Sequence, residues 1–262
     1  MKYMKDITLK AAGAKIRLKF LQWDTGFFGR PSFLLDAGRL ELTPSSELDG
    51  KFRRSFKDTF ITAKIDTATE IRVLDFLYST GFKYINTEVT LKYQDKGCCA
   101  GRSKAAQAKR GALGCKIEKL ETNEGLPYSR LGSVFTCDRF HSDPHIRKEK
   151  ADLLWINYLK NFKPSATRFL FVARIGDEAA GVILCHKDAR MKRVFLAYVA
   201  VAEKFAGAGV GTALIQHVIR HFRRFEMVTE TQVGNISAMN FYIRNGFSVI
   251  EKTRTILHRW SR

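Results

Sequence analysis

The amino-acid sequence predicts a mixed α/β fold, an α+β arrangement in which helices cover both faces of a mixed sheet. The second half of the chain alternates strand-like runs of branched and aromatic residues with apolar patterns of helical period. Both halves end alike, in a helix stopped by Gly81 or Gly246 and followed by a strand. At 262 residues, the chain is long enough for two domains.

The expected elements follow from these patterns in order. In the first half, a helix before Gly81 leads into a strand at 83–93. In the second half, the turn at Gly176 predicts a hairpin, and Val210, Leu214 and Val218 mark one apolar helix face. The strands expected there cover 115–120, 168–175, 180–186, 193–201, 227–232 and a last segment ending at 260, and the helices cover 122–140, 149–162, 210–223 and 235–245.

Composition bounds the class of protein. No apolar run reaches the roughly 18 residues that a membrane span needs, and no apolar segment follows the charged start of the chain. We therefore expect a cytoplasmic protein with no membrane partner. The five cysteines include no Cys-x-x-Cys pair, so we expect no metal.

The formal net charge of +19 predicts attraction to polyanions. Nucleic acid is one such partner. Coenzyme A and nucleotide diphosphates are also anions, and the charge alone does not choose between them. Because the basic residues are spread along the whole chain rather than gathered in one arm or helix, nucleic acid is not the partner we expect.

A glycine-rich turn follows the strand expected at 193–201. Gly207, Gly209 and Gly211 alternate with other residues and open a helix through Val210 and Thr212. Glycines let backbone amides approach an anion closely, and a helix N-terminus adds positive partial charge. The turn therefore fits a pyrophosphate, although a purely structural turn is the alternative when the pattern stands alone.

A second motif lies about 25 residues further on. Asn235 stands where a strand meets a helix, and Tyr242 follows two helical turns later, before Asn245-Gly246-Phe247. Asn235 suits a helix N-cap. A tyrosine of ordinary pKa near 10 stays protonated at neutral pH and can act as a general acid. A tyrosine in the core is the alternative.

In this order and spacing, the two motifs resemble the acyl-CoA site of the GCN5-related N-acetyltransferase (GNAT) superfamily. The resemblance implies acyl-CoA as co-substrate and Tyr242 as the acid that protonates the departing thiolate. Where the family usually carries Arg or Gln, this chain has Ala206, so Lys204 becomes a candidate phosphate contact. The implied coenzyme A-binding residues are Val199 and Val201, through amides exposed where a bulged strand splays from its neighbour, with Gly207, Gly209, Val210, Gly211, Thr212 and Asn235.

The same resemblance suggests two related halves. We expect a degenerate GNAT-like domain at 1–95, a Gly-, Ala- and Lys-rich linker at 96–114 and a catalytic GNAT domain at 115–262. Aligning Gly81 with Gly246 places Leu77 opposite Tyr242, and the first half has no Gly-x-Gly-x-Gly. The alternative is that helix, glycine and strand form a common joint without any repeat.

Two further segments resemble a narrower branch, the dTDP-fucosamine acetyltransferases. They are residues 22–29, for which aromatic packing around a turn at Thr25-Gly26 is the preferred alternative, and residues 138–144. The resemblance implies transfer of acetyl or a short hydroxyacyl group, such as 3-hydroxybutyryl, from acyl-CoA to a nucleotide-linked (dTDP) amino sugar. Surface polysaccharide biosynthesis, as of lipopolysaccharide O-antigen, would follow. A homodimer is one assembly it allows.

The segment after Cys137 carries two imidazoles and a carboxylate within five residues. His141 is a candidate base for the acceptor amine, because histidine titrates near neutral pH. Asp143 and His145 are candidate acceptor-binding residues. A solvated loop with a turn at Asp143-Pro144 is the equal alternative.

Two other functions remain open on the sequence. A peptide or protein N-acetyltransferase keeps the chemistry and changes the acceptor. A non-catalytic RNA-binding module fits the charge, but it would need neither Tyr242 nor the glycine-rich turn.

Overall fold

The computed structural model describes residues 5–11, 14–36, 45–66, 71–94 and 114–261. Within them lie eleven strands and seven α-helices in a mixed α/β arrangement, as predicted. No helix among these residues has the length and apolarity needed to cross a membrane. Of the expected linker, residues 96–113 lie outside the described residues, as does Asp95.

Contacts divide the chain into two compact units. The N-terminal unit comprises Met1–Glu88 and Lys252–Arg262, and the C-terminal unit comprises Val89–Glu251. The division expected from the sequence falls at 95 and 115. The contacts instead place the boundaries after Glu88 and after Glu251, inside the strands at 83–93 and 247–260. Val89 and Leu91 are buried in the core of the C-terminal unit, whereas Leu257 is buried in that of the N-terminal unit.

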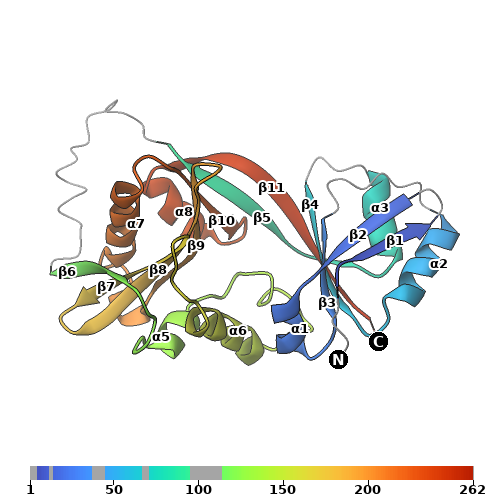
Figure 1. The fold of residues 1–262 in the computed structure, drawn as a ribbon, viewed down its shortest axis with the longest axis horizontal. Helices are drawn as coiled ribbons and strands as arrows, with labels where there is room; N and C mark the ends of the chain where they lie inside the picture. The colour runs from blue at the N-terminus through green and yellow to red at the C-terminus, as the bar shows by residue number, and fades with distance from the viewer. Residues whose placement is uncertain (1–4, 12–13, 37–44, 67–70, 95–113, 262) are drawn as a thin grey trace. The chain divides into compact units, whose positions relative to one another are not determined.

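In the N-terminal unit, strands and helices alternate from β2 onward (Figure 1). Its strands follow the order β1-β2-β3-β4, with the C-terminal part of β11 beside β4. Only β3 and β4 pair in parallel among these contacts. Its elements are β1 (Ile7–Ala11), β2 (Ala14–Phe20), α1 (Gln22–Phe28), β3 (Ser32–Asp36), α2 (Ser46–Ser55), β4 (Phe60–Asp66), α3 (Ile71–Ser79) and the first part of β5 (Lys83–Tyr93).

The residues expected to form an aromatic cluster do pack together in this unit. Trp23 and Phe27 stack with ring centroids 5.6 Å apart, and Phe28 lies 4.9 Å from Phe60. The turn expected at Thr25-Gly26 is instead part of helix α1, which ends at Gly29 in the left-handed conformation. The segment therefore serves packing.

The C-terminal unit has the strand order β5-β10-β9-β8-β7-β6. Alternate residues of β8 face opposite cores, because Ile183 and Cys185 pack with α7 while Val182 and Leu184 pack with α5 and α6. Helices therefore cover both faces of this sheet, as predicted (Figure 1). Its elements are β6 (Cys115–Leu120), α5 (Tyr128–Gly132), α6 (Lys148–Lys160), β7 (Arg168–Ile175), β8 (Glu178–Asp188), β9 (Arg193–Val201), α7 (Val210–His221), β10 (Glu226–Gln232), α8 (Ile236–Arg244) and β11 (Phe247–Trp260).

The helix expected at 122–140 is the main error of the sequence reading, since only α5 is helical there. Gly125 adopts a positive φ of 76° before α5. After it, a carboxylate oxygen of Asp138 accepts the backbone N–H of Phe140 at 2.8 Å. A side chain that satisfies nearby backbone donors in this way competes with helix formation.

Candidate active site

Strand β9 carries an extra residue in the middle of the C-terminal unit. Leu184 of β8 pairs with Tyr198, but the next residue, Cys185, pairs with Leu196, so Ala197 has no partner on β8. An inserted residue of this kind is a β-bulge, which bends a strand and re-aims its side chains. Val194 and Leu196 accordingly face the core under α7, whereas Tyr198 faces the core under α6.

The bulge coincides with a separation from β10. Parallel pairing joins Arg193–Leu196 of β9 to Glu226–Thr229 of β10 and ends there among the described residues, although β9 continues to Val201. Beyond the bulge, β9 is therefore held by β8 alone. We call the opening between the two strands after Leu196 and Thr229 the strand gap.

Two backbone N–H groups of β9 face the strand gap. Ala202 donates its N–H to Ala180 at the end of β8, at 2.9 Å. Backbone N–H groups alternate between the two edges of a strand. The N–H of Ala200 therefore also points toward β8, while the N–H groups of Val199 and Val201 point away from β8. These are the two amides that the resemblance singled out for binding the thioester and its pantetheine arm.

The glycine-rich turn opens α7 without a side-chain cap. Gly207 and Gly209 have positive φ values of 76° and 83°, and Gly209 is the N-cap, with no side-chain hydrogen bond. The first N–H groups of a helix have no partner within it. The donors of Val210, Gly211 and Thr212 therefore remain for an anion, which is what a pyrophosphate needs.

The third glycine, Gly211, also has a packing role. A Cβ on Gly211 would lie 3.0 Å from the ring of Phe241, so glycine allows α7 to approach α8. Thr212 lies beside the same helix, with its hydroxyl 3.5 Å from the Asn245 amide. Lys204, the candidate phosphate contact, forms an ion pair with Glu178 and lies over the ring of Phe205.

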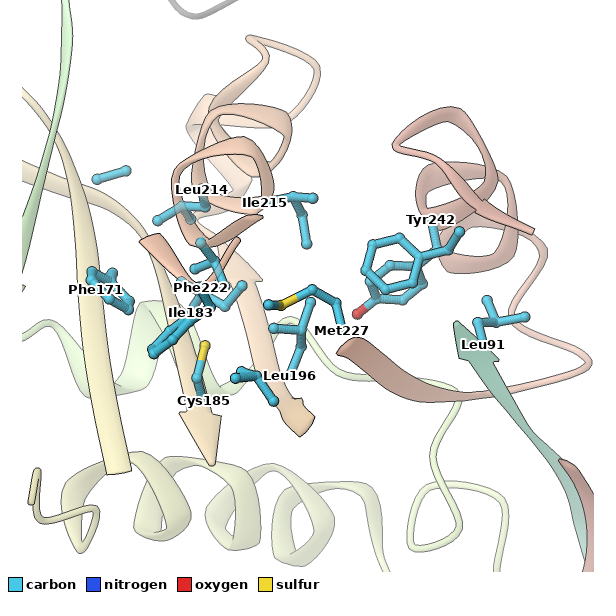
Figure 2. Close-up of a cluster of buried hydrophobic side chains, with 14 of the residues drawn as sticks. Leu91, Phe171, Ile183, Cys185, Leu196, Leu214, Ile215, Phe222, Met227 and Tyr242 are labelled. Atoms are coloured by element: carbon cyan, nitrogen blue, oxygen red, sulfur yellow. The ribbon is translucent and has the colours of Figure 1, made fainter. Parts of the chain in front are cut away.

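Tyr242 lies on α8 and is buried in the same core (Figure 2). Its hydroxyl points into the cluster on the side of Met227 (Figure 2), and Thr229 is the neighbouring polar side chain that acts on it electrostatically. Burial raises the pKa of Tyr242, which keeps the phenol protonated at neutral pH. Since Thr229 is the last residue of β10 paired with β9, the phenol lies where the strand gap begins.

Asn235 occupies the N-cap of α8. Its side-chain oxygen accepts the N–H of Ala238 at 3.1 Å. This matches the capping role that the sequence suggested, and it fixes the start of the helix that carries Tyr242.

His141 is held between two carboxylates. Its Nδ1 contacts Asp138, its Nε2 lies 2.9 Å from Asp152, and only 4% of its side chain is exposed. Burial lowers the pKa of the imidazole, but its hydrogen bonds to the two carboxylates outweigh this and the net pKa is raised. A base needs a free nitrogen lone pair, so this geometry opposes the expected role and favours a structural imidazolium.

Asp138 is the centre of this network, which sequence reasoning missed. The carboxylate also accepts the indole N–H of Trp155 at 2.8 Å, and Lys148 pairs with Asp152 at 2.7 Å. Burial raises the pKa of Asp138, but its hydrogen bond and charge interaction with His141 lower it overall. The only sequence signal was the spacing of Asp138 and His141, which does not reveal α6 as the partner.

Asp143 and His145 form a turn beside this network. Asp143 is 1% exposed, and its carboxylate accepts the backbone N–H of His145 at 2.8 Å and lies 3.1 Å from His145 Nδ1. The turn alternative holds here, but the Asp143 carboxylate is buried rather than solvated. The His145 side chain is half-exposed, and its assignment to the acceptor stays a prediction.

Glu230 is a second group that the sequence reading missed. It follows Thr229 on β10, and because strand side chains alternate, it lies on the face opposite to the Thr229–Tyr242 contact. The Thr90 hydroxyl of β5 lies 3.3 Å from its carboxylate. The strand gap thus has a phenol on one face and a carboxylate on the other. The described residues contain no cluster of three metal-ligating side chains.

Comparison with known proteins agrees with this geometry. Residues 133–247 match the model of the family described as Acetyltransferase (GNAT) family. The chain is similar to N-alpha-acetyltransferase 30 from Xenopus laevis, at 35% identity over 52% of this chain and 51% of that protein. It is also similar to N-alpha-acetyltransferase 30 from Schizosaccharomyces pombe, at 35% identity over 30% of this chain and 57% of that protein. The chain thus spans about half the length of these relatives.

Solved structures share the fold across both units. A GCN5-related N-acetyltransferase from Kribbella flavida has a TM-score of 0.59 at 12% identity, covering 97% of this chain and 90% of that one. A tandem GNAT protein from the clavulanic acid biosynthesis pathway has a TM-score of 0.55 at 14% identity, covering 97% and 81%. The chain therefore shares the fold of these structures, and residues 133–247 match the GNAT family model.

Proposed function

We propose that the chain is an acyl-CoA-dependent N-acetyltransferase whose acceptor is the α-amino group of a peptide or protein. One observation carries the reaction class: the strand gap, with the N–H groups of Val199 and Val201 facing it and the uncapped start of α7 beyond. The acceptor class is supported by the relatives, whose names specify N-alpha-acetyl transfer.

The proposed reaction assigns a task to each side of the gap. The pyrophosphate of acetyl-CoA binds the donors of Val210, Gly211 and Thr212, and the pantetheine arm lies along β9. The acceptor nitrogen bonds to the carbonyl carbon while an N–H of Val199 or Val201 stabilises the oxygen. The carbon–sulfur bond breaks, and the thiolate takes the proton of Tyr242. The nitrogen then releases its second proton to solvent, which leaves a neutral amide, and solvent returns a proton to the phenolate.

We assign Glu230 to the acceptor side. An α-amino group has a pKa near 8 and enters largely protonated at neutral pH. A carboxylate opposite Tyr242 attracts that cation and accepts its proton before attack. This role passes from His141 to Glu230, because both ring nitrogens of His141 already contact carboxylates.

The acceptor and the acyl group are tested together by release of free thiol. Acetyl-CoA and 3-hydroxybutyryl-CoA are each offered with short peptides that have a free or a blocked α-amino group, and with dTDP-linked amino sugars. We expect acetyl transfer to the free peptides alone. Transfer only to a dTDP-amino sugar would restore the acceptor expected from the sequence, which no relative reported above supports by name.

Glu230→Gln separates the acceptor role from coenzyme binding. The substitution keeps the size of the side chain and removes its charge. We expect the KM for the peptide to rise at least tenfold, with acetyl-CoA affinity unchanged in calorimetry. An unchanged KM for every peptide that is a substrate would remove Glu230 from the site.

A further inference from the structure

Two neighbouring turns of the C-terminal unit gather basic side chains that lie apart in the sequence. One turn joins β8 to β9, and the other joins α7 to β10. The N–H of Glu226 donates to the carbonyl oxygen of Lys192 at 2.9 Å and so holds the two turns side by side. The exposed basic residues on these turns and in the last turn of α7, which we call the basic patch, are Arg190, Lys192, Arg220, Arg223 and Arg224.

The carboxylates near the basic patch are already engaged. The Asp188 carboxylate caps its own turn by accepting the N–H of Met191 at 2.9 Å. Glu226 pairs with Arg193 and with Lys92, and Glu251 also pairs with Arg193. None of the five patch side chains forms an ion pair with another described residue. Their positive charge therefore remains available to an outside anion.

Further cations border the patch and cover its aromatic rings. Lys187 lies 5.6 Å from the ring centroids of Phe169 and Phe225, and Lys119 lies 5.5 Å from that of Phe169. Proteins that bind single strands offer aromatic faces for base stacking. Here the rings are partly buried and lie under ammonium groups, which favours phosphate contacts over stacking.

Coenzyme A does not account for this patch. Strand β9 leads from Arg193 toward the glycine-rich turn, and α7 leads from that turn back to His221. A helix rises about 1.5 Å per residue, so the two ends of α7 lie roughly 18 Å apart. The helix C-terminus favours one or two cations, which explains Arg220 but not Arg190 and Lys192.

We propose that the basic patch binds double-stranded RNA through its phosphate backbone. Two adjacent turns, one with Arg190 and Lys192 and the other with Arg223 and Arg224, present two pairs of cations. The narrow major groove of A-form RNA brings its two phosphate strands close together, and such paired turns can contact both. Contacts of this kind read shape and charge rather than base sequence.

The test measures binding of a fluorescent 20-base-pair RNA duplex by fluorescence anisotropy over a range of salt concentrations. The patch variant changes Arg190, Lys192, Arg223 and Arg224 to Gln. Each lost phosphate contact lowers the salt slope by roughly 0.7 to 0.9, so we expect a slope smaller by about three. At 0.1 M salt, we expect affinity to fall at least tenfold.

A matched control removes the same charge elsewhere. Lys57, Lys116, Lys160 and Lys163 are exposed, and changing all four to Gln lowers the net charge equally. We expect this control to keep most of the wild-type affinity. If both variants lose affinity equally, binding reflects the net charge and the proposal fails. Thermal melting checks that the patch variant and the control variant are folded. If the fourfold patch variant is not folded, the double variant Arg190→Gln/Lys192→Gln replaces it.

Three further outcomes would overturn the proposal. They are no RNA binding by the wild-type protein at 0.05 M salt, equal affinity for a DNA duplex of the same sequence, and displacement of RNA by saturating acetyl-CoA. Patch-dependent binding to vesicles containing phosphatidylserine, without RNA binding, would instead assign the surface to a membrane. We expect RNA to stay bound in acetyl-CoA, because the patch and the glycine-rich turn lie at opposite ends of α7.

Discussion

The parallel strand pair of the N-terminal unit is closed along its length, whereas that of the C-terminal unit opens. Every residue of β3, from Ser32 to Asp36, pairs with β4. In β9, only Arg193–Leu196 pairs with β10, and five residues follow without such pairing. In the described part of each connection, the α-helix between the two strands is α2 or α7. The same connectivity thus accompanies pairing along the whole of β3 in one unit and, in the other, pairing that ends at Leu196, next to the bulged residue Ala197.

The helices α2 and α7, which join these strand pairs, differ in how their N-termini are capped. Helix α2 begins at Ser45, whose side chain accepts the N–H of Leu48 at 3.1 Å. Helix α7 begins at Gly209, which has no side chain to accept a bond. Helix α2 thus satisfies one of its first backbone donors with a side chain, whereas none of the first donors of α7 has a side-chain partner.

The largest effect expected from this contrast concerns Tyr242. Changing Tyr242 to Phe removes the proposed acid and little volume. We expect turnover to fall by roughly 10²-fold or more, while acetyl-CoA affinity is nearly kept. Pre-steady-state thiol release measures the change. A folded variant with wild-type turnover would reduce Tyr242 to a core residue, the role that Leu77 has at the aligned position.

A substitution at Gly209 tests whether the start of α7 binds the co-substrate. Gly209 has a φ of 83°, so Gly209→Val introduces strain of about 1–2 kcal/mol and a branched side chain beside the exposed donors. We expect the Kd of coenzyme A to rise more than tenfold in calorimetry. Normal affinity in the variant would make the glycine-rich turn a connection only.

The charged network of the C-terminal unit predicts a pH dependence. Removing one partner of a buried pair costs about 3 kcal/mol or more, so His141→Ala should lower the free energy of unfolding by about that much near pH 6. The pKa of His141 is raised by its carboxylates. Its contribution is therefore complete below about pH 6.5 and is lost as the pH rises through the raised folded pKa.

Urea unfolding at a series of pH values checks this prediction. His145→Ala is the matched control, because its side chain is half-exposed and such pairs contribute at most about 1 kcal/mol. A difference between wild type and His141→Ala that stays constant up to pH 9 would contradict the charged imidazole. The aromatic packing of residues 22–29 gives no corresponding pH dependence.

The smallest expected effect is a loss of stability in the N-terminal unit. Ser45→Ala removes the cap of α2 and should lower stability by about 1 kcal/mol, with no change in coenzyme A affinity. Thermal melting and calorimetry measure the two quantities. Weaker coenzyme A binding by this variant would contradict the contrast between the units, because it would show that α2 contributes to binding the ligand.

Much of the fold was predictable because its signals are local. The bounds expected at 115–120, 168–175 and 193–201 match β6, β7 and β9, and α7 and α8 differ by at most two residues at either end. Gly81 and Gly246 both take positive φ, at 98° and 93°, as the helix ends required. Residues 122–140 were misread because Asp138 makes its bonds to Trp155 and His141 only in the folded chain.

The sequence by itself determined the order of elements, the glycines that end and begin helices, and the two motifs. These depend on side-chain period and backbone preference within a few residues. Only the tertiary structure decided where β9 leaves β10, which groups enclose His141, and that basic residues spread along the chain meet at two turns. Strand pairing and ion pairing join residues far apart in sequence, so no local pattern records them.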